Sequence, residues 1–292
     1  MATSEDVREN VKKYYGKRLE SSGDLQTGAA SCGSSCRPAP RSVTEALSEV
    51  HPEVTKRFFG CGLPFPAKLE GCRVLDLGSG SGRDCYAFSK LVGPNGHVTG
   101  IDMTQELEGG ELYFSDMFAS KIIPDHMKQD AVLWGEGMGG SLFWPDLISL
   151  AHSVGFSSPH LVSASHIVVY NSELKAKAGD ISYASGTYRL FKLPRSPAMS
   201  NATVTYKGTL AEFPDQLDFD SSHCFKKDVA VQVNGEMAAI LQSSRFSSDF
   251  KIQMLDKQES KSETTPEYCH LNPFLLADKL GSSMKQCSKT SK

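Results

Sequence analysis

Three closely spaced glycines are the residues of this chain whose spacing points most directly to chemistry. The apolar run 74–77 leads into Gly78, Gly80 and Gly82, and a helical pattern begins at Asp84. Glycine allows positive φ and lets a ligand approach the backbone with no Cβ in the way. A helix start adds N–H groups that have no partner within the helix. This order of strand, glycine turn and helix predicts a nucleotide site in a doubly wound α/β sheet.

The residues around the glycines distinguish one nucleotide from another. A dinucleotide loop of the Gly-x-Gly-x-x-Gly type needs a small residue at its sixth position, where this chain has Arg83. Asp76 stands at the strand end, where its carboxylate can lie near a cationic amino-acid moiety. Asp102 ends the next expected strand, 98–101, and is placed to accept both hydroxyls of a ribose. These features favour S-adenosylmethionine over NAD; the alternative is a tight turn with two incidental aspartates.

Longer matches along the chain point to a family. The segments that match are residues 58–64, 75–86, 96–104, 133–136, 188–192 and 244–246. Through these segments the chain resembles the arsenite methyltransferases, from about residue 10 to about residue 280, and the resemblance includes the C-terminal domain of that family.

The resemblance implies a specific reaction. Cysteine thiolates would hold trivalent arsenic, its lone pair would attack the methyl group of S-adenosylmethionine, and a thiol reductant, glutathione or thioredoxin, would support turnover. Arsenic is soft, so sulfur ligands suit it, and the thiolate is the binding form. A lone-pair nucleophile needs no general base, so catalysis would rest on holding the reactants together. The cofactor-binding residues implied are Phe59, Asp76, Gly78, Ser79, Gly80, Gly82, Asp102 and Met103.

Only some of the family's functional cysteines have counterparts in this chain. Cys61 matches directly, and Cys32 matches by its distance from the Arg-Pro pair at 37–38, although Cys36 is an extra neighbour. Cys32 and Cys61 are therefore the expected catalytic thiols and a partial arsenite site. The third family cysteine belongs to a strand region that is absent, and Gly137 stands where the fourth is expected. Phe58 and Phe59 also replace a common Tyr-Tyr pair, which removes a hydroxyl.

The middle of the cofactor domain is too short. Only residues 105–109 separate Thr104 from Gly110, whereas a parallel crossover needs a dozen or more residues. We expect the strand 112–114 to lie antiparallel beside 98–101 or to detach from it. Excision by splicing or a gene-model error would produce this pattern, and a compact natural loop is the alternative.

These observations predict an α/β fold. It would comprise a Rossmann-like class I methyltransferase sheet without the region of strands 3 and 4, and a smaller α+β C-terminal domain. The expected divisions are an N-terminal helical segment with cysteine loops (1–70), the S-adenosylmethionine-binding domain (71–172), the family-specific C-terminal domain (173–280) and a flexible tail (281–292). Helices are expected at 7–19, from 44 towards 59 with Thr44 near the N-cap, within 134–150 and at 236–243, and strands at 166–170, 203–206 and 229–233.

Composition limits the partners. The chain has 292 residues, 39% of them hydrophobic, and a formal charge of −3 without a basic run, which argues against nucleic-acid binding. No apolar stretch is long enough for a membrane span and no secretory signal is visible, so we expect a cytosolic protein. Its eight cysteines favour free thiols over a disulfide framework. His223 beside Cys224 and His270 beside Cys269 match no common zinc-finger spacing.

Two functions follow from these features. The first is an arsenite methyltransferase acting on arsenite or arsenic–thiol conjugates, with a thioredoxin-type reductant as possible partner. We expect this chain to be impaired, because both the sheet and the arsenic cage are altered. The alternative is a non-catalytic isoform that binds arsenite or cofactor weakly, or associates with the full-length enzyme.

Overall fold

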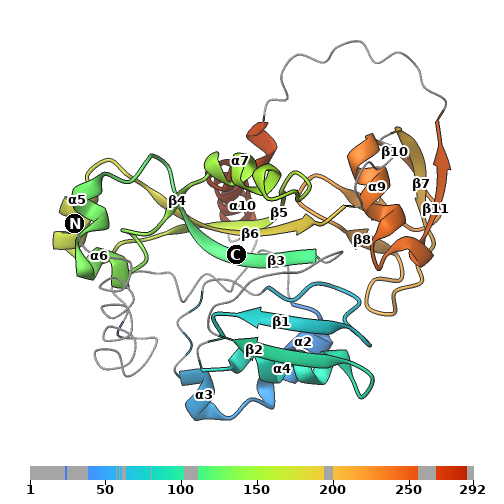
Figure 1. Cartoon of the computed structure of the whole chain (residues 1–292), viewed down its shortest axis with the longest axis horizontal. Coiled ribbons are helices and arrows are strands. Elements are labelled where there is room, and N and C mark those ends of the chain that lie inside the picture. The colour runs from blue at the N-terminus through green and yellow to red at the C-terminus, as the bar shows by residue number, and fades with distance from the viewer. Residues whose placement is uncertain are drawn as a thin grey trace.

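Three groups of strands follow one another along the chain (Figure 1). The computed structural model describes residues 24, 39–56, 58, 60, 64–79, 81–101, 111–193, 200–255 and 268–287. A parallel pair of strands comes first, a four-stranded central sheet second, and a three-stranded C-terminal sheet with a small hairpin third. The mixture of parallel strand pairs, antiparallel sheets and helices confirms the predicted α/β class.

The glycine loop lies in a strand–helix–strand unit. Strands β1 (Arg73–Leu77) and β2 (His97–Ile101) pair in parallel, and α4 (Arg83–Val92) connects them. Ala87, Phe88 and Val92 form the buried face of α4. The predicted strands 74–77 and 98–101 and the predicted helix from Asp84 are thus confirmed.

The helix expected from Thr44 towards residue 59 is interrupted and begins earlier. Helix α2 (Arg41–Ser48) follows Pro40, and the Thr44 N–H already donates to the Pro40 carbonyl at 3.1 Å, so the prediction of Thr44 near the N-cap is wrong. A second helix, α3 (Pro52–Lys56), begins at a proline. Proline lacks an N–H and disfavours helical backbone in the residue before it, which explains the break.

The central sheet has the strand order β4-β3-β6-β5. Strand β6 (Tyr183–Phe191) lies antiparallel between β3 (Glu111–Ala119) and β5 (His160–Ile167), and every residue of β6 is buried. The short β4 (Leu142–Phe143) pairs in parallel with β3. Helices complete the core beside this sheet: α5 (Asp125–Lys128), α6 (Ala131–Gly135), α7 (Asp146–Ser153), α8 (Ser172–Ala178) and α10 (Pro273–Cys287).

Strand β3 is detached from the cofactor strands. Residues 112–114, which were expected to lie beside 98–101 or to detach, pair with β6 from Glu111↔Phe191 to Ala119↔Tyr183. Among the described residues, β1 and β2 pair only with each other. The expected domain boundary at 172–173 falls between β5 and β6, two hydrogen-bonded strands of one sheet.

The strand predicted at 166–170 lies earlier in the chain. Strand β5 ends at Ile167, and the side chains of Val168 and Tyr170 are exposed. Asn171 then caps α8, because its side chain accepts from the N–H groups of Glu173 and Leu174. β-Branched residues indicated a strand, but the burial that defines it lies in residues 160–167.

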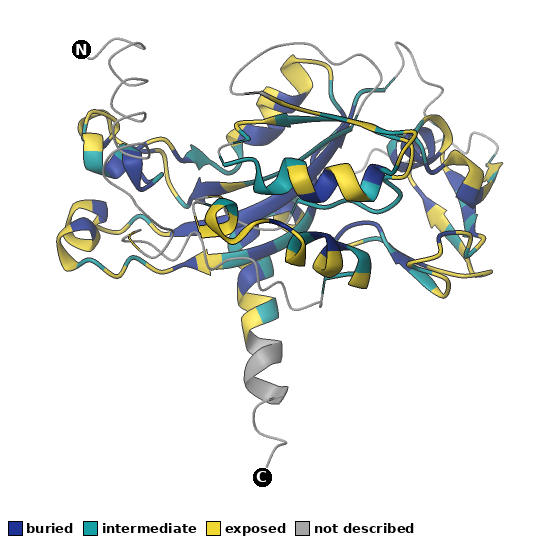
Figure 2. Cartoon of the chain, turned by 90° about the horizontal axis from the view of Figure 1, so that it is seen from below, coloured by how far each residue is buried: buried dark blue, intermediate teal, exposed yellow. Residues whose placement is uncertain are grey.

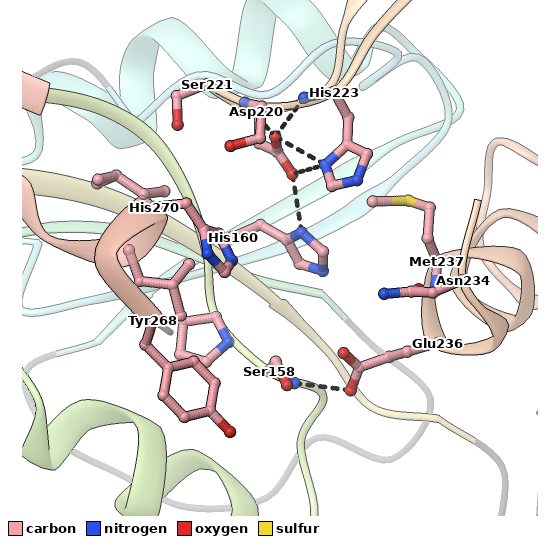
Figure 3. A pocket seen from close by; sticks show the side chains of 14 residues that line it. Ser158, His160, Asp220, Ser221, His223, Asn234, Glu236, Met237, Tyr268 and His270 are labelled. Atoms are coloured by element: carbon pink, nitrogen blue, oxygen red, sulfur yellow. Dashed lines mark hydrogen bonds and ion pairs between the residues drawn. The ribbon is translucent and has the colours of Figure 1, made fainter. Parts of the chain in front are cut away.

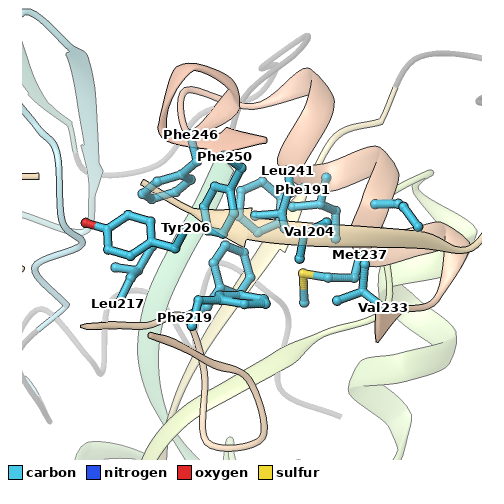
Figure 4. Packing of buried hydrophobic residues seen from close by; sticks show 14 of the residues in the cluster. Phe191, Val204, Tyr206, Leu217, Phe219, Val233, Met237, Leu241, Phe246 and Phe250 are labelled. Carbon is cyan, nitrogen blue, oxygen red and sulfur yellow. The ribbon is translucent and has the colours of Figure 1, made fainter. Parts of the chain in front are cut away.

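The C-terminal sheet has the order β10-β7-β11 and is antiparallel throughout. Its strands are β7 (Ala202–Tyr206), β10 (Ala230–Val233) and β11 (Phe250–Met254), with α9 (Gly235–Ser243), η4 (Ser247–Asp249) and the hairpin of β8 (Gln216–Asp218) and β9 (Cys224–Lys226) beside it. Their core is rich in aromatic side chains, among them Tyr206, Phe219 and Phe246 (Figure 4). The predicted strands 203–206 and 229–233 and the predicted helix 236–243 are confirmed.

Ion pairs and hydrogen bonds attach the segment before β1 to the C-terminal part. Lys68 Nζ lies 2.5 Å from Asp249 Oδ2, and Arg245 Nη2 donates to the Ala67 carbonyl at 3.0 Å. Arg245 also pairs with Glu111, the first residue of β3, whose other oxygen lies 2.5 Å from Arg189 Nη2. The segment before β1, the central sheet and the C-terminal part are therefore linked by ion pairs and hydrogen bonds around Arg245.

Burial follows this architecture, with buried residues along the strands and exposed residues on outer helix faces and loops (Figure 2). Helix α10 continues to Cys287, into the segment expected to be a tail. The helix expected at 7–19 lies outside the described residues. In the described part of the chain, no helix combines the length and apolarity needed to cross a membrane.

Candidate functional site

The glycine loop has the open backbone that a nucleotide site requires. Gly78 has φ +74° and Gly82 has φ +79°, conformations that residues with a Cβ rarely adopt. A Cβ built on Gly78 would have no atom within 4 Å, so one side of the loop is open. The Gly82 N–H donates to the Ser79 carbonyl at 2.7 Å and closes the turn, and Gly82 caps α4 without a side-chain hydrogen bond.

Asp76 is fixed by a residue that the sequence analysis did not single out. The thiol of Cys85, in the first turn of α4, donates to Asp76 Oδ2 at a sulfur–oxygen distance of 3.0 Å. Burial, together with this hydrogen bond, raises the pKa of the Cys85 thiol to about 12. Cys85 therefore remains a neutral donor that orients the carboxylate. The sequence signal for Cys85 is a polar residue in the first turn of the helix that follows a glycine loop.

Gly100 explains how these groups pack so closely. It pairs with Asp76 across the two parallel strands. A Cβ built on Gly100 would lie 2.5 Å from Cys85 Sγ and 3.1 Å from Ser79 Oγ. The absence of a side chain at this position lets the helix start and the glycine loop approach β2.

Arg83, which argues against a dinucleotide loop, connects the loop to the preceding segment. Its Nη2 lies 2.6 Å from Asp84 Oδ1, and its guanidinium carbon lies 3.2 Å from the centroid of the Phe58 ring. Burial raises the pKa of Asp84, although Arg83 acts against this shift. Ser81 Oγ donates to the Val54 carbonyl at 2.9 Å, which adds a second link between the loop and this segment.

The structure brings together part of the expected set of site residues. Asp76, Gly78, Ser79 and Gly82 lie at one end of β1 and α4. The register places Leu77 beside Ile101, so β1 and the neighbouring β2 end at the same edge of this pair of strands. Six expected residues lie outside the described part of the chain: Cys32, Phe59, Cys61, Gly80, Asp102 and Met103.

Gly137, where the resemblance implies a missing thiol, has a backbone that disfavours any side chain. Its φ is +79°, and a Cβ there would lie 3.3 Å from Met117 Cε. Ser141 Oγ donates to its carbonyl at 2.7 Å and stabilises this turn. The local backbone therefore favours glycine at this position.

Comparisons with known proteins identify the family. A methyltransferase domain model matches residues 68–107, and the model of the arsenite methyltransferase C-terminal domain matches residues 199–292. The arsenite methyltransferase of Mus musculus is 37% identical over an alignment that covers 95% of this chain and 94% of the mouse protein. The chain belongs to the arsenite methyltransferase family. The arsenite methyltransferase of Homo sapiens is 36% identical, with 97% of this chain and 94% of the human protein covered.

A solved structure of the arsenite methyltransferase family supports the fold. CrArsM, an arsenic(III) S-adenosylmethionine methyltransferase from Chlamydomonas reinhardtii, superposes with a TM-score of 0.68 at 30% sequence identity. The match covers 75% of this chain and 97% of the algal chain. The mixed α/β architecture is thus that of a methyltransferase in the arsenite methyltransferase family.

The alignments also bear on the short middle of the cofactor domain. The alignment with the mouse arsenite methyltransferase runs over 354 positions, whereas this chain has 292 residues. The mouse protein therefore has residues with no counterpart in this chain.

Proposed function

We propose that this protein binds S-adenosylmethionine on the loop between β1 and α4 and methylates thiol-bound trivalent arsenic. The observation that carries the proposal is the open glycine loop beside Asp76, in a chain of the arsenite methyltransferase family. S-adenosylmethionine, when bound, supplies an electrophilic methyl group.

The described residues fit the chemistry of this cofactor. One oxygen of Asp76 accepts from Cys85, which leaves the other oxygen to face a cationic amino group. The backbone at Gly78 is open to close approach, and the start of α4 offers N–H groups. The nearby charges of Arg83 and Asp84 neutralise each other, so they leave the Asp76 carboxylate as the local anion.

The remaining positions are assigned by the resemblance. Asp102 would accept the ribose hydroxyls, Gly80 would complete the loop, and Met103 and Phe59 would contact the cofactor. Cys32 and Cys61 would bind arsenic, because thiolate sulfur suits a soft, thiophilic element. We propose glutathione or thioredoxin as the thiol reductant and the cytosol as the compartment, since such reductants keep thiols reduced there.

We further propose that turnover by this chain is low, with a non-catalytic isoform as the second candidate. Three observations support this: the cofactor strands pair only with each other among the described residues, Gly137 occupies the position implied for a thiol, and the alignment with the mouse protein is longer than this chain. Ligands bind in such folds at the carboxyl ends of neighbouring strands, so a shortened sheet affects the substrate side directly.

The test is a calorimetric titration of the full chain with S-adenosylmethionine, followed by an assay for methylated arsenic with arsenite and a thiol reductant. We expect binding with little product. Asp76→Asn should weaken binding roughly 10–150-fold, because a hydrogen bond to a charged group contributes about 1.5–3 kcal/mol. The matched control is Asp180→Asn, whose exposed carboxylate pairs with Lys121.

Each outcome of this titration has a distinct meaning. Binding that Asp76→Asn weakens and Asp180→Asn leaves unchanged supports the cofactor site. Equal binding by both variants, or no binding by the wild-type chain, refutes it. Sustained production of methylated arsenic would overturn the proposal of low turnover and leave the cofactor site intact.

A further inference from the structure

Two histidines and an aspartate meet where the central sheet contacts the C-terminal hairpin (Figure 3). His160 is the first residue of β5, and Asp220 and His223 lie in the turn between β8 and β9. His160 Nδ1 lies 2.8 Å from Asp220 Oδ2, and His223 Nδ1 lies 2.8 Å from the same oxygen. One potential ligand atom from each residue lies within 4.8 Å of the others.

The carboxylate at the centre of this cluster is rigidly held. The backbone N–H groups of Ser222 and His223 each donate to Asp220 Oδ1 at 2.7 Å. The Ser221 N–H donates to the Leu161 carbonyl at 2.9 Å, which fixes the turn against β5.

A buried nitrogen of the cluster lacks a hydrogen-bond partner among the described residues. His160 is 8% exposed and Asp220 is 6% exposed. Within the described residues, His160 Nε2 makes no hydrogen bond. Buried polar atoms nearly always have a partner, so such an atom in a folded protein calls for an explanation.

The cluster opens onto a cavity of about 220 Å³. Its lining includes Ser158, His160, Asp220, His223, Glu236 and His270. In Figure 3 the His160 ring lies between Asp220 and Glu236, and its Nε2 points away from Asp220. Glu236 itself is positioned by the Ser158 N–H, which donates to Oε1 at 2.9 Å.

We propose that His160, Asp220 and His223 bind a divalent transition-metal ion of the zinc class. Imidazole nitrogens favour Zn²⁺, Co²⁺ and Ni²⁺, whereas Mg²⁺ and Ca²⁺ prefer sites made of oxygen ligands alone. Three protein ligands beside a cavity leave the fourth tetrahedral position for water or an exogenous ligand.

The present spacing is compatible with such an ion after a small adjustment. Tetrahedral bonds of about 2.0 Å place ligand atoms about 3.3 Å apart, so the 2.8 Å contacts must widen by about 0.5 Å. The hydrogens now between the imidazoles and the carboxylate must also leave the two Nδ1 atoms. His223 is the most exposed of the three residues and can move most easily.

Metal binding would also change the hydrogen-bonding role of His160 Nε2. When a histidine binds metal through Nδ1, its Nε2 carries the hydrogen and usually donates it to a carboxylate, a carbonyl or water. Glu236 supplies a carboxylate in the same cavity. We therefore assign Glu236 as a positioning residue for His160.

The test is a titration of metal-free full-length protein with Co²⁺, followed by its visible absorption spectrum. Cysteines also bind Co²⁺, so the thiols are alkylated first, and the spectrum is checked for thiolate charge-transfer bands. We expect one equivalent of Co²⁺ with nitrogen and oxygen ligands, displaced by Zn²⁺. His223→Ala should weaken this binding more than about 100-fold, and Glu236→Gln about 10–100-fold, the range for partners of metal ligands.

The matched control is His166→Ala. His166 also pairs with an aspartate, Asp278, at 2.7 Å, but on the exposed surface. If His223→Ala does not fold, His223→Gln replaces it, because glutamine can still donate to Asp220 but is a poor metal ligand.

Binding that His223 variants lose and His166→Ala retains supports the site. Equal binding by all variants, or no Co²⁺ bound by the alkylated wild-type protein, overturns it. A metal-dependent rise in the unfolding midpoint that the His223 variants lack provides a second readout.

Discussion

Replacing Glu111 by alanine should destabilise the protein strongly. Glu111 forms ion pairs with two arginines, Arg189 of β6 and Arg245 of the segment after α9. The side chains of Glu111 and Arg189 are 8% and 5% exposed. Burial lowers the pKa of Arg189 to about 10, which leaves its guanidinium charged at neutral pH. Loss of Glu111 would therefore leave a buried cation without its anion.

The expected magnitude follows from this burial. Removing one partner of a buried ion pair costs about 3–5 kcal/mol in the free energy of unfolding. Arg189 keeps its hydrogen bond to the Phe219 carbonyl at 3.1 Å and its contact with the Phe219 ring at 4.0 Å. These contacts place the expected loss nearer 3 than 5 kcal/mol. The corresponding fall in the unfolding midpoint is roughly 6–12 °C, taking about 2–4 °C per kcal/mol.

The assay is thermal and urea unfolding followed by circular dichroism, with Asp180→Ala as control. Asp180 forms an exposed pair with Lys121, and exposed pairs contribute at most about 1 kcal/mol. A loss for Glu111→Ala no larger than that for Asp180→Ala would refute the reasoning. It would mean that water reaches Arg189 in solution.

Three further predictions concern the cofactor loop and the turn at Gly137. Gly100→Ala would place a Cβ 2.5 Å from Cys85 Sγ, so we expect calorimetry to show weakened S-adenosylmethionine binding; unchanged affinity would show that the loop adjusts freely. Gly137→Cys should lower the free energy of unfolding by about 1–2 kcal/mol, because residue 137 has a φ of +79°. The added thiol should not restore methylation, and a gain of activity in the arsenite assay would contradict that expectation. At pH 8, Cys85 should react with iodoacetamide at least about 100-fold more slowly than exposed Cys224, because the Cys85 pKa of about 12 leaves little of this thiol as thiolate at pH 8. Comparable rates for the two cysteines, measured by mass spectrometry, would be incompatible with the hydrogen bond from Cys85 to Asp76.

Local patterns in the sequence predicted the elements that depend on neighbouring residues. The apolar run before Gly78 and the helix from Asp84 gave β1 and α4 nearly to their ends, because a strand, a glycine turn and a helix start are defined within about a dozen residues. The same reasoning failed at Thr44, where Pro40 accepts the first helical hydrogen bonds. The β-strand propensity of residues 166–170 also misplaced β5, because propensity does not show which residues are buried in the sheet.

Contacts between distant residues were beyond the sequence patterns. The pairing of β3 with β6 joins residues 111–119 to 183–191, and no local signal specifies this partner. The sequence analysis considered His223 as a zinc ligand together with its neighbour Cys224. The structure instead places it with His160, where the central sheet contacts the β8–β9 hairpin. Cys85 was not among the expected site residues, because only the folded turn brings its thiol to Asp76. Side-chain constellations depend on tertiary pairing, which one sequence does not display.

The anchoring of residues 67–68 to Arg245 and Asp249 has a consequence for the cofactor unit. The β1–α4–β2 unit is a two-stranded sheet with one connecting helix, and such a sheet has little independent stability. Its amides should exchange with deuterium through local opening well before those of the fully buried β6. Cofactor would then bind only the closed fraction, so its apparent affinity is the intrinsic affinity multiplied by that fraction. We therefore expect the salt bridge between Lys68 and Asp249 to influence cofactor affinity through the population of the closed state.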